Sequence, residues 1–178
     1  SCLRQAAKIN QIRISDSFST DESLCKIAVN SACSVNSSCA AFYRPCSNFI
    51  FTNCGSACPL LTRSLASVAD LLGDDMGKTV RFVSISVDPE RDDPAAMKAF
   101  AEKHGANRPG WLFLTGDKAK VDLIVKKLGQ YQPDVEAHST TVLAGNVPER
   151  HWTKIVPNQP PPAIAERMWT GPGGEFAD

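Results

Sequence analysis

Residues 48–61 read Asn48-Phe49-Ile50-Phe51-Thr52-Asn53-Cys54-Gly55-Ser56-Ala57-Cys58-Pro59-Leu60-Leu61. The apolar, β-prone run at 49–52 predicts a short buried strand. Pro59 opens an amphipathic pattern, and proline is favoured in the first turn of a helix because the amide it lacks would have no partner there. Cys54 and Cys58 therefore fall where a strand ends and a helix begins.

This position favours reactive thiols, because backbone N–H groups and the positive end of the helix dipole stabilise thiolates. Two helical cysteines at this spacing would hold their Cβ atoms about 5–6 Å apart, whereas a relaxed disulfide needs about 3.8 Å. We therefore expect Cys54 to lie outside the helix. The pair then suits a reversible redox site or a soft metal ion, and a structural disulfide or two inert core thiols are the alternative.

The composition indicates one globular domain. The chain has 178 residues, 43% of them hydrophobic, and its 19 basic and 19 acidic residues cancel, so nothing favours a nucleic-acid partner. No apolar run is long enough for a transmembrane helix. The seven cysteines are many for a cytosolic protein. Because the first residue is Ser1 and not Met, we expect a processed chain with any membrane anchor upstream.

The pattern after residue 47 predicts an α/β fold with a central mixed sheet flanked by helices. We expect strands at 49–52, 80–87 and 111–114, helices at 59–72, 95–104 and 118–128, a hairpin of 140–144 and 151–156, and a last helix at 163–168. In the first helix, one face should carry Leu60, Leu61, Leu65, Val68, Leu71 and Leu72.

The chain divides into three parts on this reading. Residues 1–47 form a Cys/Ser-rich extension without an assigned fold, residues 48–170 form the domain, and residues 171–178 form a flexible Gly- and Pro-containing tail. The extension carries Cys2, Cys25, Cys33, Cys39 and Cys46.

Open α/β sheets bind ligands at the carboxyl ends of their parallel strands. The cysteine loop and the polar loop after the second strand both fall at that edge, which should bring Asp88 and Glu90 near the cysteines. Of the three histidines, His104 stands at a helix end, where a cationic side chain suits the dipole, and His151 opens a strand. His138 lies in a loop beside Asp134 and Glu136, which could orient its ring.

Four stretches resemble the Sco/SenC family: the run from Phe49 to Pro59, then Val83-Ser84-Ile85-Ser86-Val87-Asp88-Pro89-Glu90-Arg91-Asp92, then Trp111 to Gly116, then His138-Ser139-Thr140. The resemblance covers about residues 48–168. It implies a thioredoxin-like fold and a copper chaperone for assembly of cytochrome c oxidase, in a periplasmic or other extracytoplasmic setting. It also implies that Cys54, Cys58 and His138 bind copper and that Asp88 lies nearby.

The ligand chemistry agrees with this resemblance. Two thiolates and an imidazole form a soft site that suits Cu(I), and with further ligands can hold Cu(II). The partner would be a subunit of cytochrome c oxidase or another copper-carrying protein. We expect Asp134 and Glu136 to tune His138, which should be a mobile ligand because its loop offers little to lock it.

A thiol–disulfide oxidoreductase is the second hypothesis, with Cys54 and Cys58 as the redox-active pair that reduces the cysteines of a partner's copper site. A peroxiredoxin fits less well, because that family has Thr-x-x-Cys and Thr52 stands two positions before Cys54. A structural domain with an incidental disulfide is the third hypothesis. The first hypothesis, the copper chaperone, describes a metallochaperone rather than an enzyme.

Overall fold

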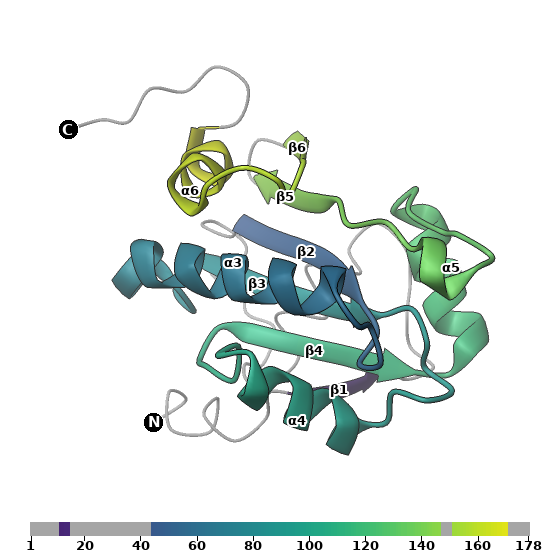
Figure 1. Ribbon diagram of the computed structural model, residues 1–178. Helices are drawn as coiled ribbons and strands as arrows, with labels where there is room; N and C mark the ends of the chain where they lie inside the picture. The colour runs from purple at the N-terminus through teal and green to yellow at the C-terminus, as the bar shows by residue number, and fades with distance from the viewer. Residues whose placement is uncertain (1–10, 15–43, 147–150, 171–178) are drawn as a thin grey trace, which may run out of the picture.

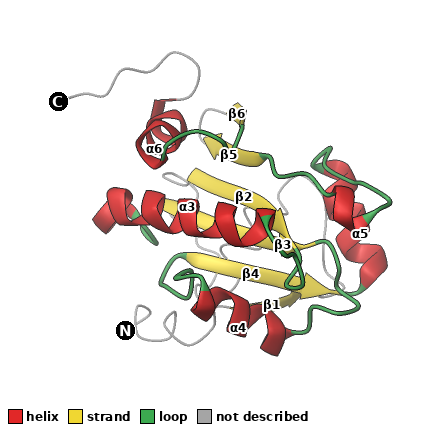
Figure 2. Cartoon of the chain, in the orientation of Figure 1, coloured by secondary structure: helices red, strands yellow, loops and turns green. Residues whose placement is uncertain are grey.

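The computed structural model describes residues 11–14, 44–146 and 151–170, and its centre is a mixed sheet (Figure 2). The strand order is β1-β4-β3-β2-β5-β6. The strands are β1 (Gln11–Ile14), β2 (Arg44–Ile50), β3 (Val80–Ser86), β4 (Trp111–Gly116), β5 (Val142–Asn146) and β6 (His151–Ile155). The first four of this order pair in parallel, while β5 and β6 run antiparallel to their neighbours.

Helices cover both faces of the sheet (Figure 1). One face packs against α3 (Ala57–Leu72), α4 (Pro94–Lys103) and α6 (Pro161–Thr170), and the other against α5 (Lys118–Lys127). Two short 3-10 helices, η1 (Gly73–Asp75) and η2 (Val135–Ala137), lie in the connections. Asp93 and Asp117 cap α4 and α5 by accepting a bond from an amide of the first turn.

Adjacent residues of the parallel strands face different cores. In β2, Ile50 belongs to the core under α3, whereas its neighbour Phe49 belongs to the core under α5. Such strands are buried on both faces and read as continuous apolar runs. Phe49, Ile50 and Phe51 form such a run, and each is at most 1% exposed.

The predicted fold class, a thioredoxin-like α/β sandwich, is confirmed, with small shifts at the element ends. The largest shift is in β2, which begins at Arg44 and ends at Ile50 rather than spanning 49–52. Its first residues look polar in sequence, but Arg44 through Ile50 pair in register with Val80 through Ser86. The α3 face was also predicted too broadly, because Leu60 and Leu71 are 61% and 58% exposed.

Part of the predicted organisation lies outside the described residues. This holds for Cys2, Cys25, Cys33, Cys39 and the tail at 171–178, so the division into three parts stays a prediction. Two pieces of the 1–47 segment are described: β1, at the sheet edge, and the start of β2, which contains the buried Cys46. No helix within the described ranges has the length and apolar character needed to cross a membrane.

Candidate metal and redox site

The two cysteines sit on either side of the start of α3. The chain leaves β2 through a turn closed by a 3.3 Å bond from the Cys54 amide to the Phe51 carbonyl. The helix begins at Ala57, so Cys54 lies outside it and Cys58 is its second residue. The Cys58 amide donates to Cys54 Sγ at 3.3 Å. The expected position of Cys54 outside the helix is confirmed.

The two thiols differ in acidity. Burial acts to raise the pKa of Cys54, but the backbone amides of Cys58, Ser56 and Ala57 donate to its sulfur and lower the pKa overall. Burial raises the pKa of Cys58 to about 12, and the neighbouring Cys54 and Asp92 add to this rise. The prediction of two low-pKa thiols is therefore wrong for Cys58, which is 1% exposed.

His138 completes the group from a loop between α5 and β5. Its Nε2 atom lies 3.2 Å from Cys58 Sγ. Its Nδ1 atom lies 3.0 Å from the Val135 carbonyl, which is an acceptor, so Nδ1 carries the proton and Nε2 presents a lone pair to the thiol. Burial lowers the pKa of His138, although Val135 and Glu136 oppose the change.

Phe51 interacts with Cys54, Cys58 and His138. Its carbonyl closes the turn to Cys54, and its amide donates toward the Cys58 sulfur. Its ring packs edge-on against the His138 ring, with 5.0 Å between centroids. The imidazole is thus held by Phe51, Cys58 and Val135. These contacts do not come from the side chains of Gln132, Pro133 or Ala137, and movement of the loop on metal binding stays a prediction.

The three side chains do not yet form a closed coordination cluster. Within the described ranges, no group of three or more His, Cys, Asp or Glu side chains stands ready to hold a metal ion. Cys58 and His138 face each other, whereas Cys54 Sγ is engaged by the Cys58 amide. Cys54 would have to turn its sulfur away from that amide to share a metal ion with the other two.

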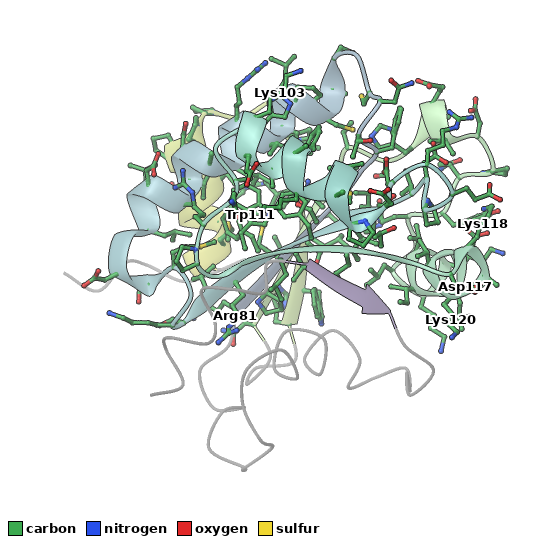
Figure 3. All side chains as sticks on the ribbon, turned by 90° about the horizontal axis from the view of Figure 1, so that it is seen from below. Arg81, Lys103, Trp111, Asp117, Lys118 and Lys120 are labelled. Carbon is green, nitrogen blue, oxygen red and sulfur yellow. The ribbon has the colours of Figure 1, made fainter. Side chains whose placement is uncertain are left out.

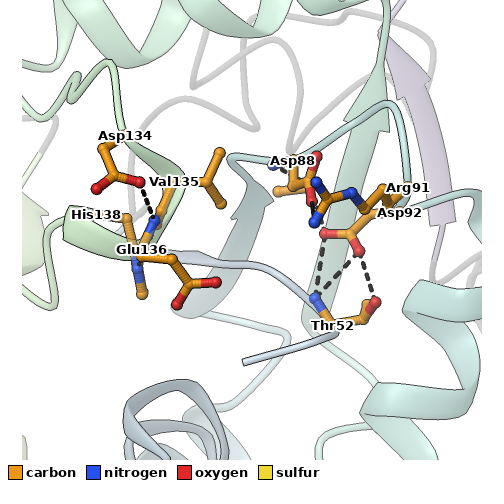
Figure 4. A network of polar contacts seen from close by, with 9 residues as sticks. Thr52, Asp88, Arg91, Asp92, Asp134, Val135, Glu136 and His138 are labelled. Carbon is orange, nitrogen blue, oxygen red and sulfur yellow. Dashed lines mark hydrogen bonds and ion pairs between the residues drawn. The ribbon is translucent and has the colours of Figure 1, made fainter. Parts of the chain in front are cut away.

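The predicted supporting carboxylates lie around this centre at different places (Figure 4). Asp88 is buried, and its Oδ2 atom lies 3.5 Å from Arg91 Nη1. Asp134 caps η2 by accepting from the Glu136 amide at 3.0 Å. Glu136 is exposed and acts on His138 through its charge. Glu90 is exposed and acts on Lys118. No described hydrogen bond or ion pair joins these carboxylates to the two thiols or the imidazole.

Asp92 is the functional candidate that sequence reasoning missed. It is 1% exposed, and its carboxyl group accepts from the amide and hydroxyl of Thr52 and from the hydroxyl of Ser86. In sequence it stands inside a run of charged and proline residues that reads as a solvated loop. The available signal was a carboxylate immediately before the helix-capping pair Asp93-Pro94.

A pocket adjoins His138 on the side of α5. It encloses about 350 Å³, including space open to solvent, and its lining includes Val87, Lys118, Tyr131, Val135 and His138. Lys118, at the start of α5 beside Asp117 and Lys120 (Figure 3), forms an ion pair of 2.9 Å with Asp122. The His138 ring therefore borders open space as well as the thiol of Cys58.

The other two histidines lie elsewhere. His104 is the C-cap of α4 and packs on Phe100 with 4.5 Å between ring centroids. Burial, with the charges of Arg63 and Lys103, lowers its pKa, which opposes the cationic form at this helix end. His151 begins β6, at the far end of the sheet order from β1.

Comparisons with known proteins point to one family. A family model described as SCO1/SenC matches residues 45–168. The SCO1 protein homolog of Bacillus subtilis (strain 168) is 41% identical over 69 residues. That alignment covers 39% of this chain and only 35% of the relative, so it spans about a third of the relative's length.

Solved structures show the same architecture. A SCO1/SenC family lipoprotein from Bacillus anthracis str. Ames is 26% identical with a TM-score of 0.62, over 72% of this chain and 81% of that one. ScoI of Bradyrhizobium japonicum with copper bound is 23% identical with a TM-score of 0.59, over 71% and 83% of the two chains. At that identity, the second similarity shows the fold alone.

Proposed function

The chain belongs to the SCO1/SenC family, and from that membership we propose that it binds copper through Cys54, Cys58 and His138 and delivers it during assembly of cytochrome c oxidase. Copper is here the cargo. The observation that carries the proposal is the 3.2 Å approach of Cys58 Sγ and His138 Nε2, with the Cys54 sulfur one hydrogen bond away. The ScoI of Bradyrhizobium japonicum, solved with copper bound, shares this fold.

The donor atoms suit copper better than zinc. Two thiolates and a neutral imidazole match the soft preference of Cu(I), while structural zinc sites are closed by a fourth ligand. Binding requires Cys58 to lose the proton that burial favours, and the metal ion must supply that free energy. Cys54, partly exposed and with a lowered pKa, is suited to meet an incoming ion first.

Anaerobic titration with Cu(I) in the presence of a chromogenic competitor tests this function. We expect about one tightly bound copper ion per chain, and loss of that ion in the Cys54→Ser, Cys58→Ser double variant. His138→Ala should bind at least about 10–100-fold more weakly, since loss of even an outer-sphere partner has that effect. Cys46→Ala is the matched control, because Cys46 is buried in β2 and should leave binding unchanged. Equal copper retention by the double variant contradicts the proposal.

The unequal thiols favour a second candidate, a thiol–disulfide oxidoreductase. Cys54 is the more exposed and more acidic thiol, as an attacking cysteine should be, and Cys58 is the buried partner that would resolve the mixed disulfide. In this reaction two electrons pass from the Cys54–Cys58 dithiol to a disulfide of the partner. A Cys54–Cys58 disulfide with a potential below about −300 mV, typical of structural disulfides, contradicts this candidate.

We also propose an extracytoplasmic, membrane-anchored setting for the full-length protein. The related structure from Bacillus anthracis is a lipoprotein, which supports this assignment. Fractionation of cells that express the full-length gene should place the protein with the membrane, exposed on the outer side. Recovery from the cytosol alone contradicts it.

A further inference from the structure

We propose that Asp92 is the positioning residue of this site: it fixes the turn at 51–54 and thereby sets how closely Cys54 is held to Cys58. The inference rests on the proposed function, because it concerns the same pair of thiols. The inference adds Asp92, which is not a proposed copper ligand and forms no described hydrogen bond to a sulfur atom. Asp92 acts through the backbone that carries Cys54.

The Asp92 carboxyl group is fastened to two strand ends. The Thr52 amide donates to its two oxygens at 3.1 and 3.2 Å, and the Thr52 hydroxyl donates to Oδ1 at 2.6 Å (Figure 4). The Ser86 hydroxyl, at the end of β3, donates to Oδ2 at 2.6 Å. Three donors thus converge on one buried group, which makes the end of β2 immobile relative to β3.

The backbone of Asp92 is itself fixed without help from the cysteines. Its amide donates to the Asp88 carbonyl at 2.9 Å, and its carbonyl accepts from the Thr115 hydroxyl, in β4, at 2.6 Å. The next residue, Asp93, caps α4. The position of the carboxyl group is therefore set by β3, β4 and α4, all of which lie outside the cysteine loop.

Thr52 passes this constraint to the sulfur atoms. It is the second residue of the turn that the Cys54 amide closes onto Phe51. The Phe51 amide also donates toward the Cys58 sulfur. Without the bonds to Thr52, Cys54 would depend on one backbone bond of 3.3 Å and on the contacts between its sulfur and the amides at the start of α3.

Only a carboxylate satisfies this arrangement. Ionised aspartate accepts hydrogen bonds at both oxygens and donates none, whereas asparagine has one acceptor oxygen and an NH₂ group. In an Asp92→Asn variant, the NH₂ group would face the Thr52 amide in either orientation, because this amide lies 3.1 and 3.2 Å from the two carboxyl oxygens, and an amide N–H cannot accept a hydrogen bond. A buried donor left without an acceptor is costly, so the turn is expected to move away.

The test measures the equilibrium of the Cys54–Cys58 dithiol and disulfide against glutathione without copper, with the pair quantified by peptide mapping. Looser positioning lowers the effective concentration of one thiol at the other, which makes the disulfide easier to reduce. We expect a change of about tenfold in the equilibrium constant for Asp92→Asn, which for a two-electron couple is a potential less negative by about 30 mV.

Three further variants separate positioning from general damage. Thr52→Val should shift the equilibrium in the same direction, and Thr52→Ser should restore the wild-type value because it keeps the hydroxyl. Ser84→Ala is the matched control, because it removes a buried hydroxyl bond between β3 and β2 that involves neither Asp92 nor Thr52. If Asp92→Asn fails to fold, the two Thr52 variants decide the matter.

The outcomes are distinct. Wild-type potentials in Asp92→Asn and Thr52→Val overturn the inference, as does an equal shift in Ser84→Ala. Copper titration of the same variants is a separate measurement. If the wild-type chain binds no copper, the proposed function fails, while the redox equilibrium still reports whether Asp92 positions the thiols.

Discussion

The junction at 51–58 and the loop at 132–138 bring their side chains to one point by different means. The junction is held from outside, by Asp92 and through it by β3, β4 and α4. The loop is held partly from within, because Asp134 caps η2 and the His138 amide and ring both bond the Val135 carbonyl, and its outside contacts are those of the His138 ring with Phe51 and Cys58. A buried, long-range network resists movement, whereas contacts within one short loop can be exchanged at a smaller cost in free energy.

This difference suits a protein that must both hold and release an ion. We expect the thiols to keep their place while the imidazole leaves with its loop. Phe51 is where the two regions meet, so it offers the strongest means of disturbing both at once.

Truncation of Phe51 should give the largest effect. We expect Phe51→Ala to lower the free energy of unfolding by about 3–5 kcal/mol, as for other buried aromatic side chains, and also to weaken copper binding. Urea unfolding measures the first effect and Cu(I) titration the second. Phe49→Ala is the matched control, because Phe49 is equally buried but faces the core under α5. Unchanged copper affinity in Phe51→Ala would show that Phe51 does not connect the junction at 51–58 with the loop at 132–138.

Copper loading should sharpen the contrast between the regions. With free copper at 100 times its dissociation constant, binding stabilises the loaded state by about 2.7 kcal/mol. Amide hydrogens at 132–138 should then exchange up to about 100-fold more slowly, because openings of this loop release the ion. Amides at 59–72 should change less. Equal protection of the loop with and without copper would show that His138 is preset rather than mobile.

Removing the cap of η2 should have a smaller, local effect. We expect Asp134→Ala to cost about 1 kcal/mol or less, as for other N-cap losses, and to appear as faster exchange of the Glu136 and His138 amides. Asp117→Ala removes a similar cap from α5 and serves as the control. A loss of stability spread evenly over the domain would mean that the loop is not an independent unit.

The smallest effect is a pH dependence that arises away from both regions. The pKa of His104 is lowered in the folded state, so the unfolded chain binds a proton more readily in the window between that lowered value and about 6.5. Stability from this residue is fully present above about pH 6.5 and is lost as the pH falls through the folded pKa. The free energy of unfolding should fall less steeply between pH 7 and 5 in His104→Gln than in the wild type. An identical slope contradicts this assignment.

Sequence reasoning reached the fold class because the strands and helices alternate with clear periodicity. It placed Cys54 outside the helix from disulfide geometry alone, and it selected His138 only through the family resemblance. It missed Asp92 because its partners, Thr52, Ser86 and Thr115, stand at the ends of three strands that only the folded sheet brings together. The raised pKa of Cys58 was missed for a related reason, since burial depends on tertiary packing.

Cys58 Sγ and His138 Nε2, which lie 3.2 Å apart, belong to residues 80 positions apart in the chain. Such a contact forms only after a large loop closes, which costs entropy and is characteristic of slow, non-local steps in folding. An unfolded or partly synthesised chain therefore lacks the contact between Cys58 and His138, although Cys54 and Cys58 stay only four positions apart. We expect the three proposed ligands to be available together only after folding, and copper binding then to favour the folded state by mass action.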